Sequence, residues 1–192
     1  GVEKILNEYQ IKLVGGDITN GEISICVNVF GYAYENNILR STAKVGDLIF
    51  ITGPLGEGRR GLEDWKNNKK TEFVKKFFNP KVDFDKSKFI SKYANSCVDI
   101  SDGLIKDLTS ICESSKVGAE IIYENIPMTN DFDDLSYGDD YKLCYTCSPE
   151  FKDSELTLED FCIGEIKSNK EIIIKKDNSV IDFKTHGWDS FE

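Results

Sequence analysis

The sequence predicts a fold of the α+β (mixed α/β) class, on three observations. Short apolar runs with the alternation typical of strands recur along the 192 residues. Stretches with helical spacing lie between them, without the strict strand–helix alternation of a parallel sheet. Hydrophobic residues make up 40% and charged residues 30% of the chain, which indicates a globular protein that buries a core.

The first quarter of the chain combines one helical pattern with three strand patterns. Apolar residues at helical spacing predict a helix over 2–9. Residues 11–17 predict a short strand that ends in a Gly-Gly-Asp turn, and residues 23–30 show the alternation of a β-strand. A further strand is expected at 46–53, before a glycine-rich loop.

The remainder is expected to be helical first and then rich in strands. Residues 60–96 predict helix with a break at Asn79-Pro80, because proline cannot continue a helix. Residues 97–100 predict a brief buried strand, and Ser101 or Asp102 is then expected to cap a helix. The inward face of that helix is predicted to be Leu104, Leu108, Ile111 and Cys112. Further strands are predicted at 119–124, 140–147, 171–176 and 179–184.

Composition excludes several classes of function. A net charge of −10 disfavours nucleic-acid binding, which needs Lys and Arg for phosphate contacts. The sequence has no apolar run long enough to span a membrane and no signal peptide at its start. Its six cysteines lie within apolar runs, which predicts reduced thiols and a cytoplasmic location. Cys144 and Cys147 have C-x-x-C spacing, but one histidine and no second pair favour core packing over zinc or redox chemistry.

Charge is distributed unevenly along the chain. Residues 66–88 contain eight lysines and three acids, which indicates a solvated helix surface. Residues 99–140 contain eleven acids and two lysines. The sequence Gly56–Gly61 satisfies G-x-G-x-x-G, yet the lysine-rich helix that follows it excludes a dinucleotide-binding unit.

Three aspartates are candidate ligands for a hard cation. Asp102 beside Ser101 is equally well explained as a helix cap. Asp99 lies in an apolar strand close to it, and a magnesium ion that bridges the two would explain that position. Asp17 follows Gly15 and Gly16, where the alternative of a simple turn is favoured.

Six motifs taken together resemble the thiamine-monophosphate kinases, relatives of aminoimidazole ribonucleotide synthetase. Their order and spacing span nearly the whole chain. They are KLVGGDITNGEISI, RSTAKVGDLIFITGPLGEGRRGL, CVDISDGLIKDL, YGDDYKLCYT, IGEI and GWDSF. The resemblance implies a synthetase-like fold and transfer of the γ-phosphoryl group of ATP to thiamine monophosphate.

The resemblance also implies roles for individual residues. Magnesium ligands would be Asp17, Asp99 and Asp102. The ATP contacts would be Gly16, Asp17, Arg40 and Ser101, and the thiamine substrate would contact Asp139 and Trp188. The family usually has glutamate where this chain has Asp139, and commonly serine where it has Gly58. No protein base is expected, because the acceptor phosphate is largely ionised at neutral pH.

The domain organisation follows from the same resemblance. It implies that residues 1–38 are the remnant of an N-terminal ATP- and magnesium-binding domain, and that 39–192 form the C-terminal domain. We expect the full-length protein to be a homodimer and the chain alone to be inactive. Two alternatives stay open, namely another ATP-dependent enzyme of the superfamily and a non-catalytic α+β assembly module.

Overall fold

A computed structural model describes residues 2–151, 160–183 and 187–188. The chain divides into two units, Gly1–Tyr32 and Ala33–Glu192. Each is described by itself. Within the described residues, none of the helices is long and apolar enough to cross a membrane.

The first unit contains the predicted helix but not the predicted strands. Helix α1 spans Val2–Glu8 and confirms the helical pattern. The strands expected at 11–17 and 23–30 are absent, so both predictions are wrong. The side chains of Ile23 and Ile25 are 98% and 86% exposed. A strand is stable only when its backbone pairs with a neighbour, and none of the described strands pairs with residues 23–30.

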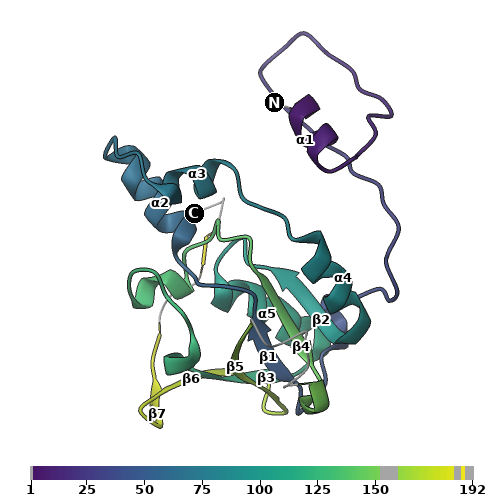
Figure 1. Ribbon diagram of the computed structural model, residues 1–192. Coiled ribbons are helices and arrows are strands. Elements are labelled where there is room, and N and C mark those ends of the chain that lie inside the picture. Colours follow the sequence, from purple (N-terminus) through teal and green to yellow (C-terminus); the bar gives the residue numbers. More distant parts are fainter. Residues whose placement is uncertain (1, 152–159, 184–186, 189–192) are drawn as a thin grey trace. The chain divides into compact units, whose positions relative to one another are not determined.

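A seven-stranded sheet is the centre of the second unit (Figure 1). Its strands lie in the order β2-β4-β1-β5-β3-β6-β7. Neighbouring strands pair antiparallel except β3 and β6, which pair parallel. The strands are β1 (Leu48–Ile51), β2 (Ala94–Asp99), β3 (Gly118–Ile122), β4 (Leu143–Cys147), β5 (Phe161–Lys167), β6 (Ile172–Lys176) and β7 (Ser179–Ile181).

Side chains from the two faces of the sheet enter two separate apolar clusters. On β1, Ile49 and Ile51 pack with the inward face of α5 (Leu104–Ser115). Phe50 points to the opposite face and packs with Ile90 of α4 (Phe84–Tyr93). This division follows from the two-residue period of a strand. It also separates Cys144 from Cys147, which are buried in different clusters, so they form no site together and the core-packing prediction is confirmed.

Two further helices precede α4 and pack against each other. They are α2 (Glu57–Lys66) and α3 (Glu72–Phe78), which lie side by side in Figure 1. Gly61 of α2 permits the close approach, because a Cβ there would lie 2.4 Å from the carbonyl oxygen of Phe73. Helix α3 ends before Asn79-Pro80, which confirms the predicted break.

The start of α5 differs from the prediction. The helix begins at Leu104 with Gly103 as its N-cap, and neither Ser101 nor Asp102 caps it. Gly103 has φ = 116°, a conformation that favours glycine and turns the chain sharply into the helix. Leu104, Leu108, Ile111 and Cys112 are buried, so the predicted inward face is confirmed.

Candidate functional site

The loop Ile100–Gly103 joins β2 to α5 and contains two of the predicted ATP- and metal-binding residues. The backbone N–H groups of Ser101 and Asp102 both donate to Oδ2 of Asp107, each with an N–O distance of 3.0 Å. Asp107 is 7% exposed and lies in the first turn of α5. Burial raises the pKa of its carboxyl, and the carboxylates of Asp102 and Asp99 raise it further, while both N–H groups favour the charged form.

The carbonyl groups of the same loop bind two other predicted residues. The N–H of Asp139 donates to the carbonyl oxygen of Ser101 over 3.0 Å. The N–H of Trp188 donates to the carbonyl oxygen of Asp102 over 2.9 Å. Backbone hydrogen bonds therefore bring both residues predicted to contact substrate next to Ser101 and Asp102, two of the residues predicted to contact ATP or metal.

Glycines make these contacts possible. A Cβ on Gly138 would lie 1.9 Å from the carbonyl oxygen of Ser101. A Cβ on Gly187 would lie 2.8 Å from the carbonyl oxygen of Asp102, and Gly187 has φ = 74°. Each glycine directly precedes a residue predicted to bind substrate. The close approach of the two backbones therefore holds Asp139 and Trp188 against the loop.

Negative charge is concentrated near Tyr141. The Tyr141 O–H donates to Oδ1 of Asp139 over 3.3 Å. Burial raises the pKa of Tyr141, and the negative charges of Asp139, Asp99 and Asp102 raise it further. Oδ2 of Asp102 lies 3.3 Å from Nζ of Lys106, so this carboxylate already has a cationic partner.

Asp99 and Asp102 fit a magnesium ion as a partial set of ligands. Magnesium typically takes one or two carboxylates and completes its shell with waters and substrate phosphates. Within the described part of the chain, no three His, Cys, Asp or Glu side chains are grouped closely enough to hold an ion. The two carboxylates could supply part of the shell of a cation that arrives with a phosphate-bearing ligand, and the described residues form no closed metal cage.

Two cavities with shared lining residues lie beside Asp99 and Asp139. Asp99 lines a cavity of about 620 Å³, and Asp139 lines another of about 470 Å³. Both cavities are lined by Lys81, Tyr141 and Lys142. Lys142 also pairs with Glu57 (2.9 Å), as does Lys76 of α3. The lysine-rich stretch predicted to be a solvated surface therefore also supplies cations beside the site.

The glycine-rich loop before α2 is attached to this site by a second buried aspartate. The N–H groups of Gly56 and Gly58 donate to the two carboxylate oxygens of Asp140, over 2.7 and 3.0 Å. A Cβ on Gly58 would lie 2.5 Å from the carbonyl oxygen of Asp139, so a serine here would require the backbone to shift. Two amides of this loop are thus engaged by protein, which agrees with the rejection of the loop as a dinucleotide-binding motif.

Because the Asp140 carboxyl is buried, we expect it to give the free energy of unfolding an unusual pH dependence. Burial raises its pKa to about 6 from 3.8, although the Gly58 and Gly56 N–H groups and Lys142 oppose the shift. In the unfolded chain the Asp140 carboxyl loses its proton near pH 4, whereas in the folded chain it keeps the proton up to about pH 6. The free energy of unfolding therefore falls as pH rises through this interval. The pKa difference corresponds to about 3 kcal/mol. Asp140→Asn has no proton to lose, so we expect its free energy of unfolding to decline less over this interval.

Urea unfolding at a series of pH values measures this effect. Asp133→Asn, at an exposed aspartate, is the matched control and should follow the wild-type profile. Identical profiles for wild type and Asp140→Asn would contradict the assignment.

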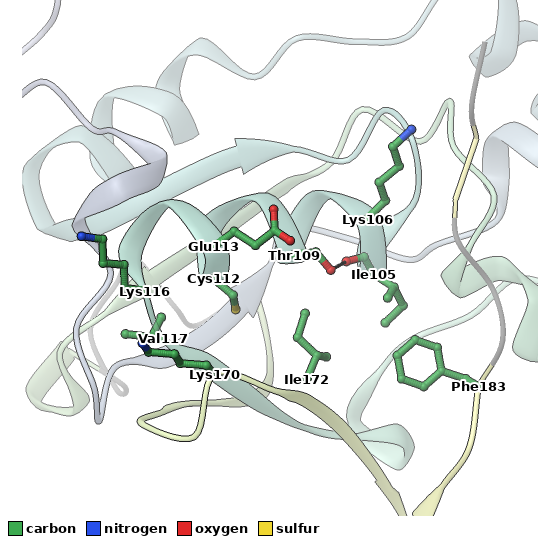
Figure 2. Close-up of a pocket in the computed structure, with 10 residues that line it drawn as sticks. All are labelled: Ile105, Lys106, Thr109, Cys112, Glu113, Lys116, Val117, Lys170, Ile172 and Phe183. Atoms are coloured by element: carbon green, nitrogen blue, oxygen red, sulfur yellow. Dashed lines mark hydrogen bonds between the residues drawn. The ribbon is translucent and has the colours of Figure 1, made fainter. Parts of the chain in front are cut away.

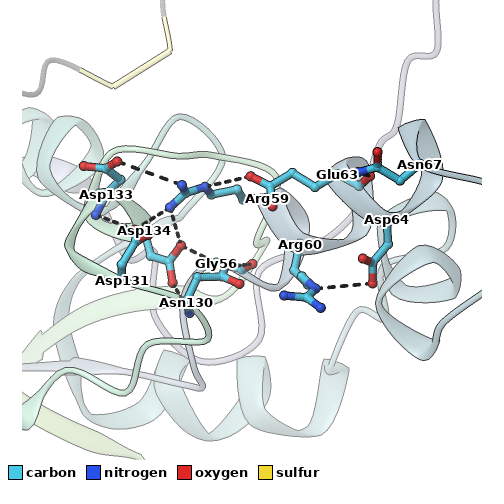
Figure 3. A network of polar contacts seen from close by, with 10 residues as sticks. All are labelled: Gly56, Arg59, Arg60, Glu63, Asp64, Asn67, Asn130, Asp131, Asp133 and Asp134. Atoms are coloured by element: carbon cyan, nitrogen blue, oxygen red, sulfur yellow. Dashed lines mark hydrogen bonds and ion pairs between the residues drawn. The ribbon is translucent and has the colours of Figure 1, made fainter. Parts of the chain in front are cut away.

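Other acids in the stretch 99–140 have a structural role. Arg59 of α2 lies 3.2 Å from Asp134 and also contacts Asp131 and Asp133 (Figure 3). Asp134 is fully buried and also accepts hydrogen bonds from Asn130. Asp131 and Asp134 anchor α2 to the loop that precedes Asp139, whereas the exposed Asp133 reaches Arg59 only at 3.9 Å.

The structure places Arg40 away from this loop and leaves Gly16 and Asp17 untested. Arg40 is at the other end of α5, where its carbonyl accepts a hydrogen bond from the Ser115 hydroxyl. Gly16 and Asp17 belong to the first unit, so their roles stay predictions. A cavity of about 630 Å³ beside α5 is lined by Thr109, Cys112 and Phe183 among others, and contains none of the predicted site residues (Figure 2).

Sequence reasoning missed two residues of this site. Asp107 and Asp140 are buried acceptors for backbone amides of the site, a role that the sequence analysis did not assign to them. The only available signal was that each follows a predicted site residue within a motif, Asp107 after Asp102 and Asp140 after Asp139.

Comparison with known proteins identifies the family. No protein-family model matches the chain. It is 34% identical to thiamine-monophosphate kinase of Buchnera aphidicola subsp. Acyrthosiphon pisum, over 98% of this chain and 67% of that protein. The chain belongs to the thiamine-monophosphate kinase family. The corresponding kinase from Buchnera aphidicola subsp. Schizaphis graminum is 36% identical, over 98% of this chain and 66% of that protein.

Solved structures of the kinase family share the fold. The thiamine monophosphate kinase of Aquifex aeolicus superposes with a TM-score of 0.64 and 28% identity, over 75% of this chain and 54% of that one. A structure titled AaThiL complexed with AMPPCP and TMP gives 0.68 and 29%, over 80% and 54%. Escherichia coli HypE, at 13% identity and a TM-score of 0.60, shares the fold alone, over 77% of this chain and 52% of HypE. The predicted mixed α/β, synthetase-like fold is confirmed.

The chain spans only part of these relatives. It covers about two thirds of the curated kinases that it matches and 54% of the solved kinase structures.

Proposed function

We propose that the protein containing this chain transfers the γ-phosphoryl group of ATP to thiamine monophosphate and forms thiamine diphosphate. The observation that carries the proposal is that the backbone N–H groups of Asp139 and Trp188 bind the loop of Ser101 and Asp102. Asp99 ends the strand that leads into this loop. Kinases at 30–36% identity that align over 97–100% of this chain support it. So does the related structure titled as a complex with AMPPCP and TMP.

The residues suggest a division of roles. Asp99 and Asp102 would hold magnesium, which neutralises phosphate charge and aligns donor and acceptor for in-line transfer. Asp139 is exposed at the mouth of its cavity, where its carboxylate would bind the cationic part of the acceptor. The Trp188 side chain is 66% exposed and can stack on a cationic ring. The Ser101 hydroxyl would contact the nucleotide.

Positioning and charge would carry the catalysis. The acceptor oxygen belongs to a phosphate whose second pKa is near 6, so it is largely ionised at neutral pH. No side chain has to remove a proton from it. The protein's contribution is to orient the two anionic substrates and to supply countercharge, including that of Lys142 and Lys81 beside the cavities.

Location and assembly are part of the proposal. The six cysteines all lie within the described residues and form no disulfide there, and Cys112, Cys144 and Cys147 are buried. Reduced thiols support a cytoplasmic location. Homodimer formation by the full-length protein stays a prediction.

The test is turnover by the full-length protein that contains this chain (the completed protein). Thiamine diphosphate should form from ATP and thiamine monophosphate only when magnesium is present. ATP consumption with a different acceptor would favour another enzyme of the superfamily. If the completed protein showed no magnesium-dependent nucleotide binding, it would be a non-catalytic module.

A further inference from the structure

Asp107 occupies a position in the site that neither metal nor substrate explains. Its carboxylate is buried, and one oxygen accepts both loop amides at 3.0 Å. A carboxylate next to Asp99 and Asp102 adds repulsion to an already acidic site. A neutral residue would cost less electrostatically, so the position needs another reason.

The two loop amides account for this carboxylate. With Gly103 at φ = 116°, the chain leaves helical geometry just before α5, and the N–H groups of Ser101 and Asp102 have no helical carbonyl to bind. An unpaired amide at a partly buried position is destabilising, and the loop would rearrange to satisfy it. Asp107 fixes both amides from one rigid point on the helix.

The orientation of these amides also orients two carbonyl groups of the loop. Each planar peptide unit joins the N–H of one residue to the carbonyl of the residue before it, so an amide that is held fixes that carbonyl as well. The Asp102 N–H thereby fixes the Ser101 carbonyl, which accepts from the Asp139 N–H, and the Ser101 N–H fixes the Ile100 carbonyl, which accepts from the Tyr141 N–H. One carboxylate thus sets the backbone geometry that holds Asp139 and Tyr141 beside Ser101 and Asp102.

We infer that Asp107 is a positioning residue for the phosphoryl-transfer site, acting through the backbone of Ser101 and Asp102 without contact to metal or substrate. The inference rests on the proposed function for its kinetic consequence, and on geometry alone for its structural one. It predicts that an uncharged acceptor of the same shape can replace the carboxylate.

The experiment compares Asp107→Ala with Asp107→Asn in the completed protein. Alanine removes the acceptor, so the Ser101 and Asp102 amides should exchange hydrogen at least about 10-fold faster, and half-maximal activity should need at least about 10-fold more magnesium. Asparagine keeps a carbonyl oxygen as acceptor, so both quantities should stay within about 3-fold of wild type. Glu113→Gln, on the same helix but away from the loop, is the control and should change neither.

A purely structural role predicts a different pattern. The folded fraction of both variants would then decrease, while the magnesium concentration for half-maximal activity of the folded molecules stayed unchanged. This result would overturn the inference. So would an asparagine variant with protected amides but a large rise in magnesium requirement, because that would make Asp107 a ligand. Should Asp107→Ala not fold, Asp107→Asn alone decides between these outcomes.

Failure of the proposed function is distinguishable. If wild type produced no thiamine diphosphate, the amide-exchange comparison would still test whether Asp107 holds the loop.

Discussion

Asp102→Asn is expected to lower the rate constant of magnesium-dependent phosphoryl transfer by about 100-fold or more, the usual scale for losing one electrostatic group of a catalytic site. The substitution removes one of the two carboxylates proposed for the ion. It leaves the loop intact, because the hydrogen bonds of Asp102 to Asp107 and Trp188 use its backbone N–H and carbonyl. The measurement is thiamine diphosphate formation by the completed protein over a range of magnesium concentrations.

The matched control is Asp133→Asn, which makes the same change at an aspartate of the Arg59 cluster. Its rate and magnesium dependence should equal those of wild type. Equal rates for Asp102→Asn and wild type would remove Asp102 from the proposed metal site.

Gly138→Ala is expected to disrupt the junction between the loop and Asp139. The new Cβ would lie 1.9 Å from the Ser101 carbonyl oxygen, so one backbone segment must move away from the other. Overpacking of this kind costs about 1–3 kcal/mol, and the contact with backbone places this case at the upper end. Because the Asp139 N–H loses its acceptor, activity should decrease more than the loss of folded protein explains.

Chemical unfolding and activity per folded molecule measure the two effects separately. Gly21→Ala serves as the control, because nothing lies within 4 Å of the corresponding Cβ position. A Gly138→Ala variant with wild-type stability and wild-type affinity for thiamine monophosphate would contradict the described packing.

A strand was predictable where the structure also gives it a neighbouring strand to pair with. Strands such as β1 and β4 alternate apolar side chains and pair with each other, and both were predicted. Residues 23–30 have an equally clear alternation, but a strand also needs a neighbour that the pattern cannot reveal. Strand β5 was missed because Gly164 interrupts its apolar run. That glycine is required because a Cβ there would lie 2.1 Å from the Glu120 carbonyl oxygen.

The site was predictable only in part, for a physical reason. Asp99, Ser101 and Asp102 are adjacent in sequence, so their grouping follows from the motif itself. Asp139 and Trp188 join them through backbone carbonyls, which every residue possesses and which therefore leave no signal in the sequence. The predicted start of α5 was wrong for a related reason. Gly103 and the Asp107 carboxylate determine how the chain turns into the helix, and the capping pattern of Ser101 and Asp102 does not reveal this.

The most direct measurement is the position of the metal in crystals of the completed protein with Mn²⁺ and a non-hydrolysable ATP analogue. Anomalous scattering from manganese should place an ion about 2.1 Å from carboxylate oxygens of both Asp99 and Asp102, the coordination distance of small divalent cations. Ordered nucleotide without an ion at these two carboxylates would contradict the account.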